Sequence, residues 1–312
     1  MPDQLKSPHR PAVPAANQIC AVMVVYNPES TLEDNARALL TEVARLIIVD
    51  NCSEPSNRAV TAALASACNF EVIWNAQNIG LAAALNTGIR RALLNESYAW
   101  IATFDQDSRV SAGYSDNMLA AYDACPFQNQ VTLIGPCHVL SSERPSGKPF
   151  GHNTLFREIP VTLQSGSLFS RSSLTSIGLF DESFFIDYVD FEFCLRLRKG
   201  GFRIIEAVHA PLFHRVGTPT VHTFLKKSCV VFNHSPVRRY YAARNRLRVY
   251  ARYLLSDPRW IGHDMWSWFK EMIKLVLFEK DRWRKLAFIA RGVWDALRGR
   301  SGIYGKSISP RI

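Results

Sequence analysis

Short apolar runs alternate with amphipathic segments through the first third of the chain. Runs of this length that are rich in β-branched and aromatic residues predict buried strands. Strands that are apolar on both faces and separated by helices predict a mostly parallel sheet that helices cover on both sides. The expected strands span residues 19–26, 46–50, 70–74 and 98–104, and the expected helices span residues 30–43, 56–67 and 80–95.

The pattern changes in the middle of the chain. Residues 135–180 are rich in Gly, Ser and Pro and predict loops with short strands, one of them at 161–169. A helix is expected at 188–199, ended by a glycine pair, and a strand at 202–208. From residue 236 onward the periodicity is helical. The expected organisation is a disordered N-terminal tail, an α/β catalytic domain and a helical C-terminal region, at residues 1–17, 18–235 and 236–312.

Two segments of the C-terminal region carry apolar side chains at helical spacing. The first contains Ile261, Met265, Trp268, Phe269, Met272 and Val276. The second contains Trp283, Leu286, Ala290, Val293, Trp294 and Leu297, with Arg282, Arg284, Lys285, Arg291 and Arg298 beside them. Basic helices with such faces bind the membrane interface, but the same faces also pack on the rest of a protein or on a second subunit. Both interpretations stay open, and a homo-oligomer formed through these helices is plausible.

The charge is distributed unevenly over the 312 residues, whose net charge is +10. Residues 221–312 hold 20 Lys and Arg against 6 Asp and Glu, a balance of +14. Residues 1–220 hold 17 against 21, a balance of −4. Because five of the seven Trp also lie in the last third, the sequence indicates that a basic, aromatic region meets an anionic surface.

Several classes of protein are disfavoured. The seven cysteines are scattered without a Cys-x-x-Cys pair, which gives no zinc site and fits a reducing cytoplasm. The first residues lack the apolar core of a signal peptide, and no apolar stretch reaches the roughly 18 residues of a spanning helix. No Gly-x-Gly-x-x-Gly follows the first strand, which counts against a dinucleotide-dependent enzyme.

Two carboxylates, Asp105 and Asp107, follow the strand at 98–104. The carboxyl ends of such strands face the crevice where open α/β sheets bind ligands. Adjacent carboxylates repel each other, so a site that concentrates them usually holds a cation, and Mg²⁺ completes its coordination with water and phosphate oxygens. The pair therefore indicates a metal–diphosphate site, although the same spacing is common in solvated loops.

An ordered set of motifs accompanies this pair. In chain order they are Val25-Tyr26-Asn27-Pro28, Val49-Asp50-Asn51, Asn78-Ile79-Gly80, Asp105-Gln106-Asp107-Ser108, Ser165-Gly166-Ser167, Asp187-Tyr188-Val189-Asp190 and His214. The set resembles family 2 glycosyltransferases over about residues 19–256. Within that family it is most similar to the bacterial rhamnosyltransferase branch. The resemblance implies an α/β, GT-A-type, Rossmann-like fold with C-terminal helices.

The resemblance also implies an activity. The expected reaction is inverting, metal-dependent transfer of L-rhamnose from dTDP-L-rhamnose to a hydroxyl of a lipid-linked glycan or glycolipid, as in O-antigen or rhamnolipid synthesis. Relatives that use a UDP-hexose leave that donor open. The implied metal is Mg²⁺ or Mn²⁺. Its implied ligands are Asp107, Asp105 and His214, with His209 as a competitor for the last position and the ribose as another partner for Asp105.

The resemblance assigns further residues to the nucleotide. Asp50 would accept the N3–H of uracil or thymine, and Tyr26 and Pro28 would form the floor of the base pocket. Asp50 in a turn is otherwise an ordinary helix cap. Asn78 and Gly80 open a helix whose N-terminus favours phosphate.

The catalytic base is expected at Asp190. Val189 stands where the family has Glu, so the neighbouring Asp187 and Glu192 remain alternatives, and Asp187 shares a helical face with Asp190. A base on the side of the sugar opposite the leaving group gives single displacement with inversion.

A cluster of arginines near residue 240 has two interpretations. Arg238, Arg239 and Arg244 would clamp the donor diphosphate or an anionic acceptor, or they would form an ordinary basic helix surface.

The expected location is the bacterial cytoplasm, peripheral at the inner face of the membrane. Two other functions are alternatives. The basic region would suit nucleic acid, but the sequence shows no such motif and the acidic crevice would repel a phosphate backbone, so no nucleic-acid partner is expected. Metal-dependent phosphoryl hydrolysis would use the same paired carboxylates.

Overall fold

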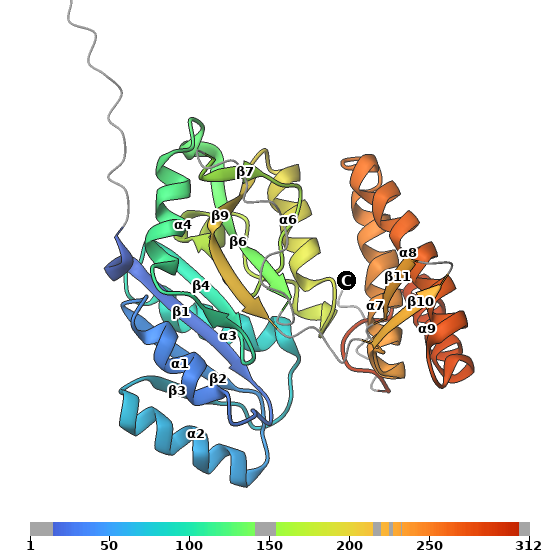
Figure 1. The fold of residues 1–312 in the computed structure, drawn as a ribbon, viewed down its shortest axis with the longest axis horizontal. Helices are drawn as coiled ribbons and strands as arrows, with labels where there is room; N and C mark the ends of the chain where they lie inside the picture. The colour runs from blue at the N-terminus through green and yellow to red at the C-terminus, as the bar shows by residue number, and fades with distance from the viewer. Residues whose placement is uncertain (1–14, 141–153, 215–219, 225–226, 232, 306–312) are drawn as a thin grey trace, which may run out of the picture.

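The computed structural model describes residues 15–140, 154–214, 220–224, 227–231 and 233–305. The predicted tail at residues 1–17 lies almost wholly outside the described residues. In Figure 1 an α/β body built on a central sheet stands beside a separate group of C-terminal helices.

Nine strands of the described residues form the central sheet, in the order β3-β2-β1-β4-β8-β6-β9-β5, with β7 also paired to β9. The strands β3, β2, β1 and β4 are mutually parallel, whereas β8 runs antiparallel between β4 and β6. The strands are β1 (Ile19–Val25), β2 (Arg45–Asp50), β3 (Glu71–Trp74), β4 (Trp100–Asp105), β5 (Arg109–Val110), β6 (Val131–Leu140), β7 (Phe156–Glu158), β8 (Ser167–Ser170) and β9 (Arg203–His214). A separate hairpin pairs β10 (Thr220–Phe224) with β11 (Lys227–Val231).

Strand β1 illustrates why the first strands are apolar throughout. Each of its seven residues is at most 8% exposed. Successive side chains of a strand point to opposite faces, so Met23 joins the core under α1 and α4 while Val22 joins the core under α3 and α6. The helices of this body are α1 (Leu32–Leu40), α2 (Pro55–Cys68), α3 (Leu81–Leu93), α4 (Tyr114–Asp123), α5 (Arg171–Ser176) and α6 (Val189–Lys199).

The C-terminal helices pack on one another and on the body. They are α7 (Pro236–Tyr253), α8 (Pro258–Phe278) and α9 (Arg282–Leu297). Helix α9 crosses α7 closely at Gly292, where a Cβ atom would lie 2.4 Å from the carbonyl oxygen of Tyr240. Val249 of α7 and Ile261 of α8 are buried in the core that contains α3 and α6. The packing therefore continues across residue 236, where the sequence predicts the C-terminal region to begin.

The strands and helices expected in the first third are present, with ends displaced by a few residues. The strand expected at 161–169 is wrong in its first part, because β8 begins only at Ser167. Residues 164–166 form a turn instead, and Gly166 donates its backbone N–H to the carbonyl of Thr103 at 2.7 Å. Gly166 adopts φ +75°, and a Cβ there would meet the side chains of Leu212 and Pro136. The backbone of residues 164–166 is therefore held by contacts with the end of β4, not by the regular pairing of a strand in the sheet.

Candidate active site

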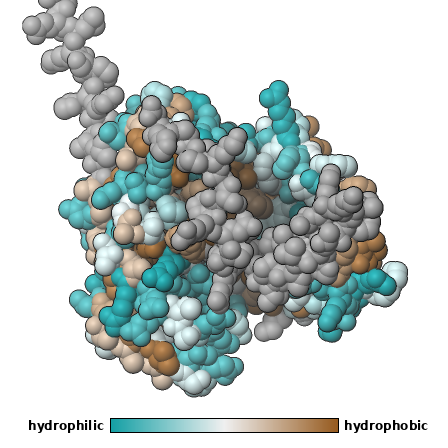
Figure 2. Space-filling view, in the orientation of Figure 1, coloured by the Kyte–Doolittle hydropathy of each residue, from teal (hydrophilic) through white to brown (hydrophobic). Residues whose placement is uncertain are grey.

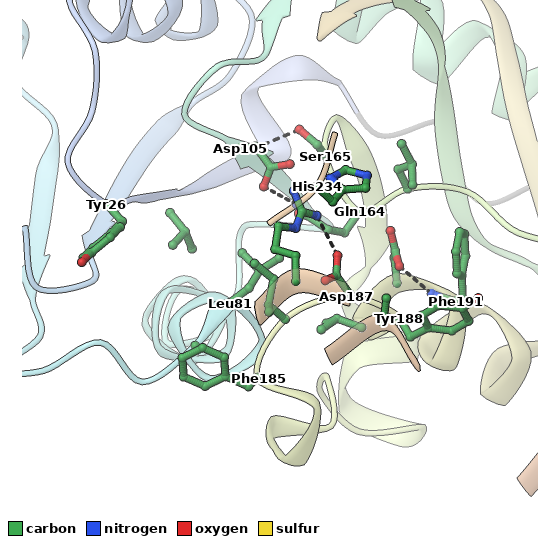
Figure 3. A pocket seen from close by; sticks show the side chains of 18 of the residues that line it. Tyr26, Leu81, Asp105, Gln164, Ser165, Phe185, Asp187, Tyr188, Phe191 and His234 are labelled. Carbon is green, nitrogen blue, oxygen red and sulfur yellow. Dashed lines mark hydrogen bonds and ion pairs between the residues drawn. The ribbon is translucent and has the colours of Figure 1, made fainter. Parts of the chain in front are cut away.

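A pocket of about 600 Å³ opens at the carboxyl ends of β1, β2 and β4. The N-terminus of α3, the loop before α6 and the first turns of α7 complete its wall. Figure 3 shows acidic, amide and aromatic side chains from these separate segments gathered around one space. Nine residues predicted from the sequence line it, namely Tyr26, Asn78, Gly80, Asp105, Asp107, Asp187, Asp190, Arg238 and Arg239.

The turn after β4 carries the two acids and is held from behind. The backbone N–H of Asp105 donates to Ser165 Oγ at 2.9 Å, and Ser165 Oγ lies 2.7 Å from Ser108 Oγ. Gln164 Nε2 donates to Asp105 Oδ1 at 2.6 Å. Gln106 accepts the backbone N–H of Tyr26 at 2.8 Å, which ties the end of β4 to the end of β1. The turn that contains Ser165 therefore braces Asp105.

Asp50 lies behind the pocket lining at the end of β2 and is fully buried. Its Oδ1 accepts the guanidinium Nε of Arg58 at 2.9 Å and the backbone N–H of Ser53 at 3.0 Å. Its Oδ2 has no hydrogen-bond partner among the described residues. Arg58 also lies over the ring of Trp74, and sequence reasoning missed it because no local pattern links it to Asp50. Pro28 is half-buried and, like Asp50, does not line the pocket.

Asn51 organises the segment before α3. Its side chain donates to Asn78 Oδ1 at 3.0 Å and accepts the backbone N–H of Ile79 at 3.1 Å. Gly80 follows with φ +87°, and a Cβ there would lie 2.5 Å from the ring of Phe185 and 2.7 Å from its carbonyl oxygen. The glycine therefore admits the loop before α6, whereas the sequence assigned it to close approach by a nucleotide.

That loop has an unusual backbone. Phe185, Asp187 and Tyr188 all adopt positive φ values, of 58°, 62° and 65°. Such conformations cost free energy in residues that carry a side chain, so surrounding contacts must hold them. The side-chain amide nitrogen of Asn245, in α7, holds the loop by donating to three backbone carbonyls at 2.7–2.9 Å, those of Phe184, Ile186 and Asp187. Helix α7 thus fixes the acidic wall of the pocket.

The two acids of this wall differ in their surroundings. Asp187 accepts the guanidinium of Arg238 at 2.6 Å, across the pocket from α7. Asp190 begins the first turn of α6 and accepts the backbone N–H of Phe191 at 2.9 Å. Burial, and after it the nearby carboxylates of Asp105 and Asp187, raise the pKa of Asp190 to about 7. A carboxyl with that pKa is suited to exchange protons near neutral pH.

The remaining predicted residues lie elsewhere. Arg244 is 1% exposed, and its guanidinium donates to the carbonyl of Gly302 at 2.7 Å, so it supports the pocket wall from behind rather than lining it. His214 is the last residue of β9, and its side chain lies outside what the structure describes. Its neighbour Phe213 pairs with Arg109, so the backbone of His214 is beside the turn that follows Asp107. His209 is exposed on β9 and away from the lining.

His234 lines the pocket although no pattern in the sequence indicated it, whereas Arg239, which also lines it, belongs to the predicted arginine cluster. His234 precedes α7, and burial together with Arg238 and Arg239 lowers its pKa, which favours the neutral imidazole. Arg239 is buried and pairs with Glu271 at 2.5 Å. Glu192, an alternative base, is buried and holds Arg196 at 3.1 Å, as an i, i+4 pair would.

The acids at the pocket fit a hard divalent cation. Asp105 and Asp107 offer carboxylate oxygens, the ligands that Mg²⁺ and Mn²⁺ prefer. Among the described residues no group of three His, Cys, Asp or Glu forms a complete metal cage. The donor set therefore suits a cation that takes few protein ligands and fills its shell from phosphate and water.

Comparison with known proteins gives a consistent family. The family model described as "Glycosyl transferase family 2" matches residues 20–178. The dTDP-rhamnosyl transferase RfbF of Shigella flexneri is 31% identical in an alignment of 249 positions that covers 73% of this chain and 78% of that protein. The low-salt glycan biosynthesis hexosyltransferase Agl10 of Haloferax volcanii is 24% identical in an alignment, gaps included, of 318 positions that covers 93% of each chain.

Solved structures confirm the fold at low sequence identity. The structure of S. aureus TarS 1-349 matches 90% of this chain and 82% of that chain, with a TM-score of 0.54 and 14% identity. GalNAc-T7, solved with UDP, GalNAc and Mn2+, matches 76% of this chain but only 48% of its own, with a TM-score of 0.56 and 12% identity. The GT-A-type α/β fold expected from the sequence is confirmed.

Proposed function

Since this chain belongs to glycosyl transferase family 2, we propose that it transfers L-rhamnose from dTDP-L-rhamnose to a hydroxyl of a lipid-linked glycan or glycolipid. The observation that carries the proposal is the pocket itself. It brings Asp105 and Asp107, which suit a metal–diphosphate group, to face Asp187 and Asp190, one of which has a pKa suited to a base.

The dTDP-rhamnose donor has one support, and a pyrimidine base, thymine or uracil, has another. One relative, covered over most of its length, is named a dTDP-rhamnosyl transferase. The other is Asp50, whose buried Oδ2 has no partner among the described residues while Oδ1 is held by Arg58. A buried carboxylate oxygen without a donor is costly, and the N3–H of thymine or uracil would satisfy it. Discrimination between thymine and uracil belongs to the experiment below.

Asp190 is the proposed base. Its carboxylate takes the proton of the acceptor hydroxyl as that oxygen bonds to C1 of the sugar and the C1–O bond to the diphosphate breaks. Asp187 is less suited to the role because Arg238 already neutralises it at 2.6 Å. Attack from the side opposite the leaving group inverts the configuration at C1, so a β-linked donor would give an α-L-rhamnoside.

Asp107 and Asp105, with His214 as a further candidate, would hold Mg²⁺ or Mn²⁺. A divalent cation bound there offsets the charge that develops on the leaving diphosphate. The chain's own residues prepare the site, because Ser165 and Gln164 hold Asp105 in place.

Calorimetric titration of dTDP, UDP and GDP tests this function directly, each with and without Mg²⁺. Wild type should bind dTDP tightly only with Mg²⁺, and Asp107→Ala should lose that binding. Glu96→Ala removes an exposed acid far from the pocket lining and should bind like wild type. Preference for UDP would keep the family and replace the donor. Absence of all nucleotide binding would refute the transferase proposal.

We also propose that α8 and α9 bring the enzyme to the inner face of a bacterial membrane. No helix in the described ranges is long and apolar enough to cross a bilayer. The apolar faces predicted from the sequence are only partly buried. Trp268 and Met272 pack inward against Leu275, whereas a neighbouring stripe of α8 is exposed. The exposed large apolar side chains of these helices are Met265, Trp266, Phe269, Ile273, Val276, Leu277, Trp283, Trp294 and Leu297.

Exposed Arg284, Arg291 and Arg298 accompany the Trp residues of α9. Figure 2 shows hydrophobic surface at the outer edge of the C-terminal helices, next to hydrophilic side chains. This combination suits an anionic lipid surface. Wild type should sediment with vesicles that contain phosphatidylglycerol and far less with pure phosphatidylcholine. The double variant Trp266→Ser, Phe269→Ser should bind about 100-fold more weakly, given roughly 1.5 kcal/mol for each of the two buried aromatics. Equal binding by variant and wild type would refute the membrane face.

A further inference from the structure

Gln164 stands out among the polar residues of the pocket. It lines the pocket yet is only 4% exposed. Its backbone is fixed, since its carbonyl accepts Thr103 Oγ1 at 2.6 Å and the N–H of Ser167 at 3.0 Å. Its side-chain Nε2 donates to Asp105 Oδ1 at 2.6 Å, and the opposite atom, Oε1, is buried with no hydrogen-bond partner among the described residues.

The hydrogen bond to Asp105 decides which way the amide points. A carboxylate accepts hydrogen bonds and has none to donate, so only the NH₂ end of Gln164 faces Asp105. Oε1 must therefore point away from it. A buried amide oxygen without a donor is destabilising, and a bound ligand that donates a hydrogen bond to it would remove that penalty.

The position of Gln164 identifies the part of the ligand that it meets. One residue along, Ser165 braces the turn of Asp105 and Asp107, the side proposed for the diphosphate. In the other direction, the carbonyl of Thr162 contacts Cys194 of α6, one turn beyond the proposed base Asp190. The segment thus spans the interval between the leaving group and the base. In a single displacement the transferred sugar occupies that interval.

We propose that Gln164 Oε1 accepts a hydrogen bond from a hydroxyl of the donor sugar, while Nε2 holds Asp105. The proposal rests on the glycosyltransferase function above. The diphosphate is excluded as the partner because phosphate oxygens at neutral pH have almost no proton to donate. Gln164 is then a specificity-determining residue that reads the sugar and a positioning residue for Asp105. Figure 3 shows Gln164 and Ser165 beside Asp105 at the pocket.

The test compares binding of dTDP with binding of dTDP-L-rhamnose. Gln164→Met keeps the length of the side chain and removes both polar ends, and Gln164→Ala gives a second, smaller variant. Gln130→Met changes an exposed glutamine and serves as the control. We expect the affinity for dTDP-L-rhamnose to fall about tenfold more than the affinity for dTDP, the effect of one lost hydrogen bond to the sugar. Thermal unfolding of each variant shows that it is folded.

A second arm identifies the hydroxyl. Donor analogues lacking the 2-, 3- or 4-hydroxyl are titrated into wild type and Gln164→Met. One analogue should bind wild type more weakly than the full sugar but bind the variant equally well, as in a double-mutant cycle.

Three results would overturn the inference. Equal losses for dTDP and dTDP-L-rhamnose would mean that Gln164 acts only by holding Asp105. No loss for either ligand would mean that it touches neither. If every deoxy analogue is penalised as much in the variant as in wild type, its partner is not a sugar hydroxyl. If wild type binds no nucleotide, the proposed function fails and not this inference alone. If wild type prefers UDP, the same comparison is made with UDP and UDP-sugars.

Discussion

The sheet body and the C-terminal helices place apolar and charged side chains in opposite ways. In the body, strands such as β1 bury every residue, and carboxylates collect at one open edge. In the helices, charged pairs are buried and large apolar residues are exposed. Glu279, 6% exposed, receives both Arg239 and Lys285 between α7, α8 and α9, whereas Trp283 is 75% exposed.

This difference separates residues that serve folding from residues that serve contacts with other molecules. Most apolar residues of the body are buried in its own core, with scattered exceptions such as Val60 and Leu94. Among the described residues, the apolar stripe of α8 and the Trp residues of α9 are exposed together, which is why we propose a lipid surface as their partner. Part of the basic excess of this region is also buried, because Arg239, Arg244, Arg246 and Lys285 are all less than 9% exposed. Net charge over a segment therefore overstates its free basic surface.

The largest expected effect tests the functional edge of the body. Asp190→Asn should reduce turnover by about 1,000-fold through loss of the base, with dTDP binding within about twofold of wild type. Single-turnover transfer to a rhamnose acceptor measures the first quantity and calorimetry the second. Asp187→Asn is the matched comparison. If it abolishes turnover while Asp190→Asn does not, the base is Asp187.

The next effect tests the buried charges of the helices. Glu279→Gln keeps the shape of the side chain but leaves Arg239 and Lys285 without their shared counter-charge. Breaking a buried pair in this way should lower the free energy of unfolding by about 3 kcal/mol. Urea denaturation followed by circular dichroism measures it, with Glu96→Gln, an exposed acid, expected to stay within about 0.5 kcal/mol. An equal, small change in both variants would show that the network does not stabilise the helices.

Much of the fold was predictable because hydrophobic periodicity is a local signal. Strand β1 and helices α3 and α6 lie where the pattern of the sequence places them. The prediction of a strand at 161–166 was wrong because Gln164 and Ser165 are held by hydrogen bonds to Thr103 and Asp105, about 60 residues earlier in the chain. Its apolar residues favoured a strand, and nothing local indicated that tertiary contacts would override that preference.

The same reasoning applies to the site. Asp105 and Asp107 were predicted because they stand directly after a strand, and Asp190 was predicted because the family resemblance places a base at that position. Gln164 and Arg58 were missed because their importance lies in partners that are distant or off-pattern in the sequence. Arg244 was predicted in the donor site, yet it is buried against backbone carbonyls, since the sequence does not reveal which face of α7 meets the loop.

Two glycines sharpen the comparison within the helices. Gly292→Ala would place a Cβ 2.4 Å from the Tyr240 carbonyl and force α9 away from α7, lowering the free energy of unfolding by about 2 kcal/mol. Gly262 of α8 has open space around its Cβ position. Gly262→Ala should raise stability by about 0.5–1 kcal/mol, because alanine favours the helix. Thermal unfolding measures both, and a stabilising Gly292→Ala would contradict the close crossing.

A pH dependence that belongs to the body completes the comparison. Because burial raises the pKa of Asp190 to about 7, the base is protonated below that pH, and kcat/KM should fall about tenfold per pH unit as pH decreases from 7. The free energy of unfolding changes with pH in the opposite direction. The folded state retains the proton where the unfolded carboxyl has lost it, so wild type loses stability as pH rises from about 4 to 7. Asp190→Asn should remove that part of the slope in urea denaturation at pH 5, 6 and 7. A slope that is identical in the two proteins would show that Asp190 ionises near its ordinary pKa and would weaken its assignment as the base.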